Sequence, residues 1–232
     1  MNTKINEWND SYENKDNFIF YPHEHVIRFV SKFIRKRIGL FEFSDRTKNI
    51  NSEVRVLDLG CGIGRHVIYC SEMGLKTFGI DLSNVAIDFA KKWANHNELN
   101  DIKNRILQGD IRKLPWDNNY FQFALSHGVL DSMKFEIARE ACVELGRVMS
   151  IGGLFYCDLI SGDDSNHSKD FSGEEQIISD HEHGTIQLYF NMSKIQLLIQ
   201  DVFKINECEL VRRKDIISGS YISRYHLVLE RI

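Results

Sequence analysis

VLDLGCGIG, at residues 56–64, is a short apolar run that ends in the closely spaced glycines Gly60, Gly62 and Gly64. An apolar run of this length is typical of a buried strand, and glycines at its end allow the backbone to turn tightly into a helix. The N-terminus of that helix offers free N–H groups to a polar ligand. We therefore predict a strand, a glycine turn and a helix that form one wall of a nucleotide-type cofactor site.

Strand and helix patterns alternate on both sides of this turn. The apolar spacing predicts helices over 65–73, 83–94 and 136–149, and strands over 76–81, 104–109, 121–126 and 154–160. Crossovers of this length imply parallel neighbours, whereas 203–212 and 221–230 are close enough to pair antiparallel. We therefore predict an α/β fold with a Rossmann-like, doubly wound, mostly parallel sheet, closed by a C-terminal antiparallel hairpin and preceded by an N-terminal helical cap.

No linker divides the chain into domains. Its 232 residues contain only two prolines and no Gly/Ser-rich connection, which favours one domain over 1–232. Its expected parts are a helical cap (1–50), a cofactor-binding core (51–160), a polar lid or insertion (161–185) and a C-terminal helix with antiparallel strands (186–232). Within them, we expect a helix from His25 to about Gly39 and a strand over 185–190.

The composition narrows the class of function. The 29 basic and 33 acidic residues give a formal net charge of −4, which argues against nucleic-acid or membrane binding over the whole surface but leaves room for a local basic patch. Five cysteines without CxxC spacing are typical of reduced thiols, and the polar start has no secretory pattern. We expect a cytoplasmic protein with no nucleic-acid partner, no membrane partner and no resident metal, and the sequence does not predict its oligomeric state.

Two acidic residues follow later strands and suit a nucleotide. Asp81 lies about 20 residues beyond the first glycine, where a carboxylate accepts hydrogen bonds from ribose hydroxyls. Asp110 follows the next strand, where a carboxylate meets an adenine amino group. A dinucleotide fingerprint needs a glycine at position 65, which is Arg65 here, so a nicotinamide-dependent oxidoreductase is the less favoured reading.

Four motifs together resemble those of the class I S-adenosylmethionine-dependent methyltransferases, and the resemblance covers most of the chain from Glu53 to Ile232. They are VLDLGCGIGRH, GIDLS, QGDIRKLPW and FALSHGVLDSM, and RVMSIGGLFYCDL is similar to the family's next segment. The resemblance implies S-adenosylmethionine as cofactor and S-adenosylhomocysteine as product. The cofactor-binding residues that it implies are Asp58, Gly60, Gly62 and Gly64 at the methionine end, Asp81 and Leu82 at the ribose, Asp110 and Ile111 at the adenine, and Ser126 and His127 beneath the sulfonium.

His127 and Asp131 are the candidate catalytic residues. Methyl transfer from a sulfonium is an in-line displacement that needs a base only if the acceptor holds its proton tightly. His127 directly follows a strand at the expected site, and Asp131 lies four residues later and is placed to orient it or to bind substrate. Alternatively, His127 only shapes the pocket and Asp131 caps a turn.

Candidate substrate-binding residues lie at both ends of the chain. They are Tyr12, Tyr21, His183, Tyr189 and Arg224. Aromatic residues before the first long helix of this family often cover the cofactor or acceptor, and the alternative is packing within the cap. The pairs His23/His25 and His181/His183 have a spacing that suits a metal, but no fixed third ligand accompanies them, so we predict no metal site.

Missing motifs narrow the acceptor. The chain lacks the [DN]-P-P-[YF] motif of adenine-methylating enzymes and the Pro-Cys nucleophile of cytosine methylation. We therefore expect methylation of oxygen, or as the next choice nitrogen, on a small molecule, with a surface-polysaccharide precursor as one candidate. A non-catalytic S-adenosylmethionine-binding regulatory protein is the alternative.

Overall fold

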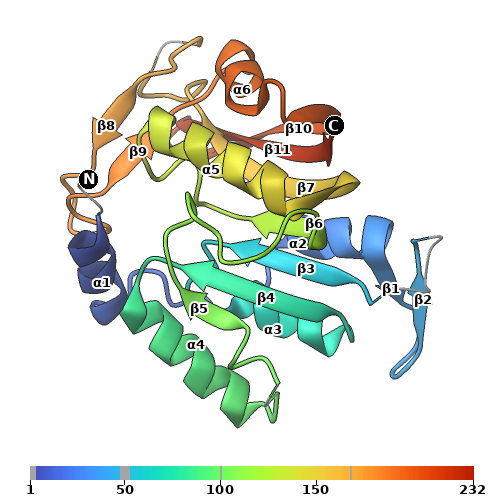
Figure 1. The fold of residues 1–232 in the computed structure, drawn as a ribbon. Helices are drawn as coiled ribbons and strands as arrows, with labels where there is room; N and C mark the ends of the chain where they lie inside the picture. The colour runs from blue at the N-terminus through green and yellow to red at the C-terminus, as the bar shows by residue number, and fades with distance from the viewer. Residues whose placement is uncertain (1–3, 48–52, 100, 168) are drawn as a thin grey trace.

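The centre of the protein is one seven-stranded sheet (Figure 1). The computed structural model describes residues 4–47, 53–99, 101–167 and 169–232. The strands lie in the order β10 (Phe203–Lys214), β11 (Tyr221–Arg231), β7 (Met149–Ser161), β6 (Phe121–Ser126), β3 (Arg55–Leu59), β4 (Lys76–Asp81) and β5 (Ile106–Gln108). From β7 to β5 all neighbours are parallel, whereas β11 is antiparallel to both β7 and β10. The predicted parallel sheet with a closing antiparallel hairpin is confirmed.

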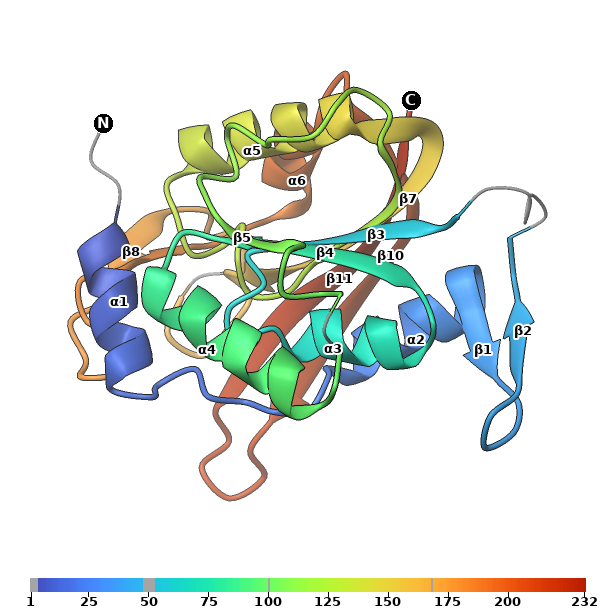
Figure 2. The same ribbon diagram turned by 60° about the horizontal axis from the view of Figure 1, so that its bottom comes forward.

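Helices cover both faces of the sheet (Figure 2). Helices α5 (Phe135–Val148) and α6 (Met192–Ile199) lie on one face, and α3 (Arg65–Glu72) and α4 (Asn84–His96) lie on the other. Side chains alternate along β7, so buried Phe155 packs with the cluster under α5 and Tyr156 with the cluster on the opposite face. None of the helices among the described residues is long and apolar enough to cross a membrane.

The N-terminal segment departs from the predicted helix. It folds as α1 (Ile5–Glu13), α2 (Glu24–Phe29), a π-helical turn (Val30–Ile34) and a hairpin of β1 (Arg35–Arg37) with β2 (Phe43–Asp45). The helix thus ends at Ile34 and not near Gly39, because Arg35 is extended and forms an ion pair of 2.5 Å with Asp45. Ile38, which fits the apolar spacing of a helix, is 59% exposed in the turn of this hairpin.

The polar segment after β7 contains a short strand of its own. Strand β8 (Glu174–Gln176) pairs antiparallel with β9 (Ile186–Leu188) in a separate two-stranded sheet. A strand was expected over 185–190; the structure pairs residues 186–188 with β8, and Phe190 forms a single parallel bridge with Ser161 of β7. This small sheet lies beside α1 in Figure 1. It thereby brings the residues just before β9 toward the N-terminal helix.

Candidate functional site

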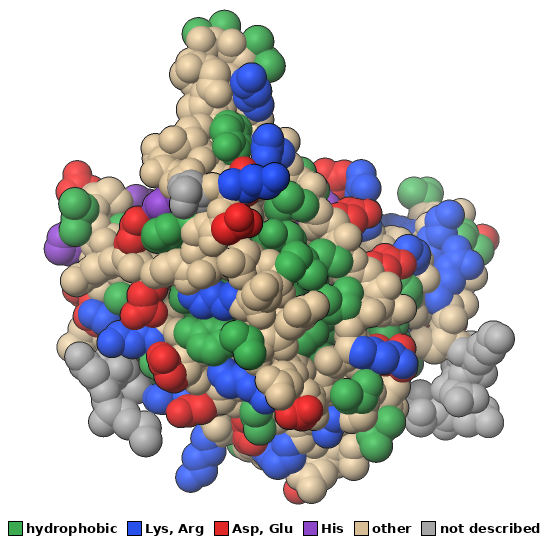
Figure 3. Space-filling model, turned by 90° about the horizontal axis from the view of Figure 1, so that it is seen from above, with side chains coloured by type: hydrophobic (Ala, Val, Ile, Leu, Met, Phe, Trp, Pro, Cys, Tyr) green, Lys and Arg blue, Asp and Glu red, His purple; other side chains and the backbone are tan. Residues whose placement is uncertain are grey.

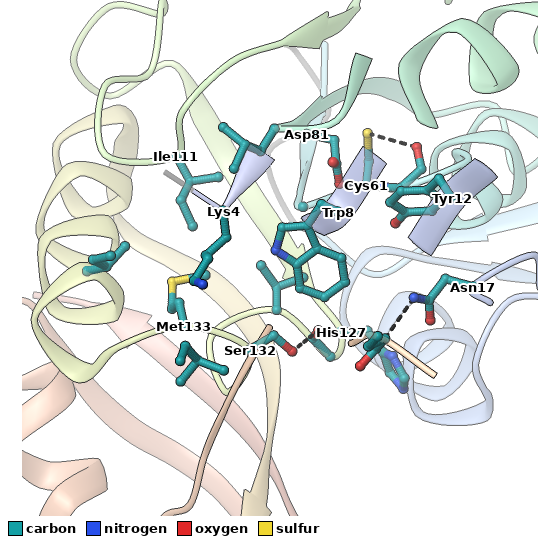
Figure 4. Close-up of a pocket in the computed structure, with 18 of the residues that line it drawn as sticks. Lys4, Trp8, Tyr12, Asn17, Cys61, Asp81, Ile111, His127, Ser132 and Met133 are labelled. Carbon is teal, nitrogen blue, oxygen red and sulfur yellow. Dashed lines mark hydrogen bonds between the residues drawn. The ribbon is translucent and has the colours of Figure 1, made fainter. Parts of the chain in front are cut away.

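A cavity of about 630 Å³ opens at the carboxyl ends of the parallel strands. Its walls come from the glycine turn after β3, the ends of β4 and β6, the segment after β5, helix α1 and residues 182–187. Figure 4 shows Trp8 of α1 between Asp81 and Ser132, with Tyr12 beside Cys61. The elements that the sequence separates by more than a hundred residues therefore meet around one space.

The glycine turn is held in place by Asp81. The backbone N–H of Gly62 donates to Asp81 Oδ2 over 2.8 Å, and the N–H of Ser83 donates to Asp81 Oδ1 over 2.9 Å. Gly62 has φ of +52°, and an added Cβ would lie 2.5 Å from the hydroxyl of Tyr12. Gly60 and Gly62 line the cavity, whereas Gly64 packs against Ala90 of α4 and does not.

The expected adenine end also lies in the cavity wall. Leu82, Asp110 and Ile111 all line it, as does Arg112. The carboxylate of Asp110 accepts hydrogen bonds from Arg112 Nε over 3.0 Å and Arg112 Nη2 over 2.5 Å. This pairing lowers the pKa of Asp110 and occupies the oxygens that a purine would use.

Asp58 and Ser126 lie beneath the cavity wall and do not line it. Both are 1% exposed, and within the described residues Asp58 Oδ2 and Ser126 Oγ have no hydrogen-bond partner. The basic side chain paired with Asp58 is that of His66, whose Nδ1 lies 3.9 Å from Asp58 Oδ2. Burial raises the pKa of Asp58 to about 7.

His127 lines the cavity between a guanidinium and a carboxylate. Its Nδ1 lies 3.2 Å from Arg65 Nη2, and its Nε2 lies 3.5 Å from Asp158 Oδ2. Because a guanidinium only donates, Nδ1 is the accepting nitrogen and Nε2 carries the proton. Burial, followed by repulsion from His23 and Arg65, lowers the pKa of His127 to about 2, so the ring is neutral at physiological pH.

Asp131 does not reach His127 as we expected. It is fully buried, and its Oδ2 accepts hydrogen bonds of 2.8 Å from both Nη1 and Nη2 of Arg224 and one of 2.9 Å from the N–H of Ile160. Burial raises its pKa to about 6, against the attraction of Arg224. Asp131 therefore orients Arg224, and the carboxylate that lies beside His127 is that of Asp158.

Asp158 is the residue that the sequence analysis missed. The register pairs Ser126 of β6 with Cys157 of β7, so the residues that follow, His127 and Asp158, are neighbours. Asp158 Oδ1 also accepts a hydrogen bond of 2.8 Å from the N–H of Gly128. Its position toward the carboxyl end of a predicted parallel strand was the available signal.

Only two of the five expected substrate-binding residues line the cavity. Tyr12 and Arg224 do. Tyr21 is 81% exposed, and His183 lines a separate cavity among carboxylates of α1. Tyr189 packs against the ring of His167, with 4.4 Å between centroids. The expectation fails for these three because sequence position does not show which side of a loop or short strand a side chain takes.

The histidines of the chain are more clustered than expected. His23 lies 4.0 Å from His127 between ring centroids, and His25 stacks on His226 at 3.6 Å. Within the described residues, no group of three or more His, Cys, Asp or Glu side chains is arranged to hold a metal ion. Of these histidines, His127 lines the cavity together with His66, whereas His25 and His226 line a separate groove.

The match to known proteins covers the walls of the cavity that come from the central sheet, but not α1, residues 182–187 or Arg224. Residues 57–157 match the family model of the methyltransferase domain, which spans β3 to β7. The predicted resemblance to the class I S-adenosylmethionine-dependent methyltransferases is confirmed over this segment. This methyltransferase therefore uses S-adenosylmethionine as its cofactor. No curated protein gives a significant match to the sequence.

Solved structures show the same fold at low sequence identity. A SAM-dependent methyltransferase from Methanosarcina mazei has a TM-score of 0.65 and 20% identity, covering 79% of this methyltransferase and 94% of that chain. A structure described for the conversion of a disulfide bond into a thioacetal group during echinomycin biosynthesis has a TM-score of 0.69 and 16% identity, covering 99% and 92%. Geranyl diphosphate C-methyltransferase from Streptomyces coelicolor A3(2) has a TM-score of 0.56 and 14% identity, covering 78% and 72%.

Proposed function

We propose that this methyltransferase methylates an acidic oxygen, or as the next choice a nitrogen, of a small molecule held between α1 and β9. The observation that carries the proposal is the position of His127, neutral and on the cavity wall, with its Nε2 facing Asp158. A neutral imidazole backed by a carboxylate is suited to accept a proton, because the carboxylate stabilises the imidazolium that forms.

The residues present fit S-adenosylmethionine. The carboxylate of Asp81 accepts hydrogen bonds from the N–H groups of Gly62 and Ser83 at different oxygens, and it keeps lone-pair capacity for the ribose. Gly60 and Gly62 leave the backbone open at the methionine end, and Leu82 and Ile111 supply apolar contact for a purine. We assign Asp110 a smaller share in adenine binding, because Arg112 already occupies its carboxylate.

Asp58 and Ser126 contribute indirectly in this proposal. Neither lines the cavity, so their contact with the methionine end runs through ordered water. Their unpartnered buried atoms, Asp58 Oδ2 and Ser126 Oγ, support such a polar bridge, since a buried polar atom is seldom left without a partner. Gly64 has no direct part, because it serves the packing of α3 against α4.

The acceptor half of the cavity is partly apolar. Trp8, Met133 and Ile186 line it together with Arg224 and Gln187. These groups suit an acceptor with an aromatic or aliphatic body and one polar end. A structural neighbour in complex with geranyl diphosphate shows that this fold accommodates a small molecule.

The chemistry of His127 selects the kind of acceptor group. Bound S-adenosylmethionine supplies an electrophilic methyl group on a sulfonium. His127 releases its contact with Arg65, takes the acceptor's proton at Nδ1 and shares the resulting charge with Asp158 at Nε2. Because burial lowers its pKa, His127 is a weak base and suits an acceptor group that is itself acidic, such as a phenol or an enol. A neutral amine needs no base before transfer. A sugar hydroxyl does need one, and it is too weak an acid for a base of low pKa, so the site does not support methylation of a surface-polysaccharide precursor.

A comparison of acceptor classes tests this proposal. The purified protein is incubated with S-adenosylmethionine and matched panels of phenols and carboxylic acids, amines and sugar hydroxyls, and methylated products are identified by mass spectrometry. We expect products from the first panel, and then from amines. Products from sugar hydroxyls alone would contradict the proposed role of His127.

A further inference from the structure

Two hairpins carry most of the strongly exposed hydrophobic side chains of this protein. Of the seven large hydrophobic side chains among the described residues that are at least 76% exposed, four lie at hairpin tips: Leu40 (78%), Phe41 (90%), Ile216 (82%) and Ile217 (96%). The first two lie in the turn of β1 and β2, and the others lie in the turn of β10 and β11. None of the four lines the methyl-transfer cavity.

Both hairpins project from the same edge of the molecule. They reach the lower edge of Figure 2, and the longer one forms the projection at the top of Figure 3, with hydrophobic side chains at its tip and Lys or Arg below them. A groove of about 660 Å³ joins their bases, lined by Lys36 and Arg46 from the first hairpin region and Glu209 and His226 from the second. An ion pair between Lys32 and Glu207 ties the two regions together.

The two tips are ordered turns that hold their apolar side chains outward. In the longer hairpin, Asp215 Oδ1 accepts hydrogen bonds from the N–H groups of Ile217 and Ser218. In the shorter one, the guanidinium of Arg37 donates to the carbonyls of Gly39 and Leu40. Hydrogen bonds between side chains and backbone therefore fix the two turns, and the apolar side chains at their tips are exposed as a result.

Cations without ion-pair partners surround both tips. Within the described part of the chain, they are Lys36, Arg37, Arg46, Arg213 and Lys214, whereas Arg212 is paired with Asp163. Glu42 and Asp215 are the acidic residues of the two turns, and Asp215 is already used by backbone N–H groups. The local charge of this edge is thus positive although the chain carries a net charge of −4.

We propose that this edge docks on an anionic lipid bilayer, with Leu40, Phe41, Ile216 and Ile217 entering the boundary between head groups and acyl chains. Apolar tips flanked by Lys and Arg match the layering of such a surface, where phosphates lie just outside the hydrocarbon. Two separate projections with a polar groove between them suit a fluid surface better than a protein interface, which needs one contiguous apolar core.

Flotation with lipid vesicles tests the proposal. The whole protein is mixed with vesicles of phosphatidylcholine, with or without phosphatidylglycerol, at low and high salt. We expect flotation with the anionic vesicles and its weakening at high salt. The double variant Ile216→Ser/Ile217→Ser and the double variant Leu40→Ser/Phe41→Ser should each reduce the vesicle affinity about tenfold or more. Arg213→Glu/Lys214→Glu should reduce it by roughly fivefold for each cation lost.

Matched variants away from the two hairpins serve as controls. Ile151→Ser/Ile178→Ser removes two comparably exposed isoleucines (76% and 86%), and Lys91→Glu/Lys92→Glu reverses two neighbouring lysines of α4. Both controls should float like the wild type, and all variants should bind S-adenosylhomocysteine normally, because none of the changed residues lines the cavity.

Three outcomes would overturn the proposal. They are an absence of wild-type flotation with anionic vesicles, an equal loss of flotation in the control variants, and a wild-type dimer in light scattering that Ile216→Ser/Ile217→Ser converts to monomer. The last result would assign the edge to contact between copies of the chain. None of them bears on methyl transfer, which is measured separately.

Discussion

The Nε2 atom of His127 lies 3.5 Å from Oδ2 of Asp158, and Nη1 of Arg224 forms an ion pair of 3.2 Å with the same oxygen. Arg65 takes the other ring nitrogen of His127 at 3.2 Å. The ring is thereby oriented on both sides, in a state that a small movement converts into a hydrogen-bonded pair with Asp158. This relationship makes Asp158 the partner of His127 in the proposed chemistry.

Replacing either member of this pair should lower turnover. We expect His127→Asn and Asp158→Asn each to reduce kcat by about 100-fold or more, because the proton acceptor or its stabilising charge is lost. The affinity for S-adenosylhomocysteine, measured by calorimetry, should change much less. Asp164→Asn is the matched control, since Asp164 is a buried carboxylate that pairs with His167 and does not line the cavity. Equal losses of turnover and cofactor affinity in His127→Asn would instead assign His127 to shaping the pocket.

Asp81 should matter more to cofactor binding than Asp110. We expect Asp81→Ala to weaken the binding of S-adenosylhomocysteine by about 1–3 kcal/mol, through the loss of charge-assisted hydrogen bonds to the ribose. Asp110→Ala should have a smaller effect, because Arg112 occupies that carboxylate in the ligand-free protein. Calorimetric titration of both variants measures the difference. An effect of Asp110→Ala that equals or exceeds that of Asp81→Ala would refute this ranking.

The contact between α1 and the glycine turn predicts a compensating pair of substitutions. Gly62→Ala should destabilise the protein by about 1–3 kcal/mol, because the added Cβ meets the Tyr12 hydroxyl at 2.5 Å and φ is +52°. Tyr12→Phe removes that hydroxyl, so Tyr12→Phe/Gly62→Ala should recover part of the loss. Urea unfolding of the two single variants and the double variant measures the coupling. Simple additivity of the two changes would show that α1 does not press on the turn.

Asp58 predicts how stability depends on pH. Its pKa in the folded protein, about 7, lies above the ordinary value of 3.8, so the folded state holds a proton that the unfolded state releases. Its contribution to stability is therefore present below pH 4 and is lost as the pH rises to about 7, a change of roughly 4 kcal/mol. Asp58→Asn should remove this loss and raise the melting temperature more at pH 8 than at pH 5. A stabilisation that is equal at both pH values would contradict the assignment.

The periodic parts of the fold were open to prediction from sequence. Strand β6 occupies the predicted range 121–126, because a short, mostly apolar run between turn signals has few alternatives. The hairpin of β1 and β2 escaped prediction, because Ile38 continues the helical spacing of the preceding residues and only the ion pair of Arg35 with Asp45 and strand pairing reveal the break. The spacing of apolar residues along the chain does not indicate the pairing of β1 with β2.

In the candidate site, too, positions set by local periodicity could be predicted from the sequence, whereas positions set by strand pairing could not. Asp81 was placed correctly in the cavity wall by its distance from the glycine turn along a regular strand-helix-strand unit. The neighbours of His127 depend on the register between β6 and β7, which brings Asp158 beside it, and on the antiparallel strand β11, which delivers Arg224 to Asp131. Spacing in the sequence pointed to Asp131 because it is near in the chain, and tertiary pairing decided otherwise.

Transfer of a labelled methyl group tests the central claim most directly. The protein is incubated with methyl-labelled S-adenosylmethionine and a cell extract, and the label is measured separately in the small-molecule and macromolecular fractions, with His127→Asn as a parallel sample. The account predicts label in the small-molecule fraction with the wild type and a loss of most of it with the variant. Label only in macromolecules, or tight cofactor binding with no transfer at all, would contradict it.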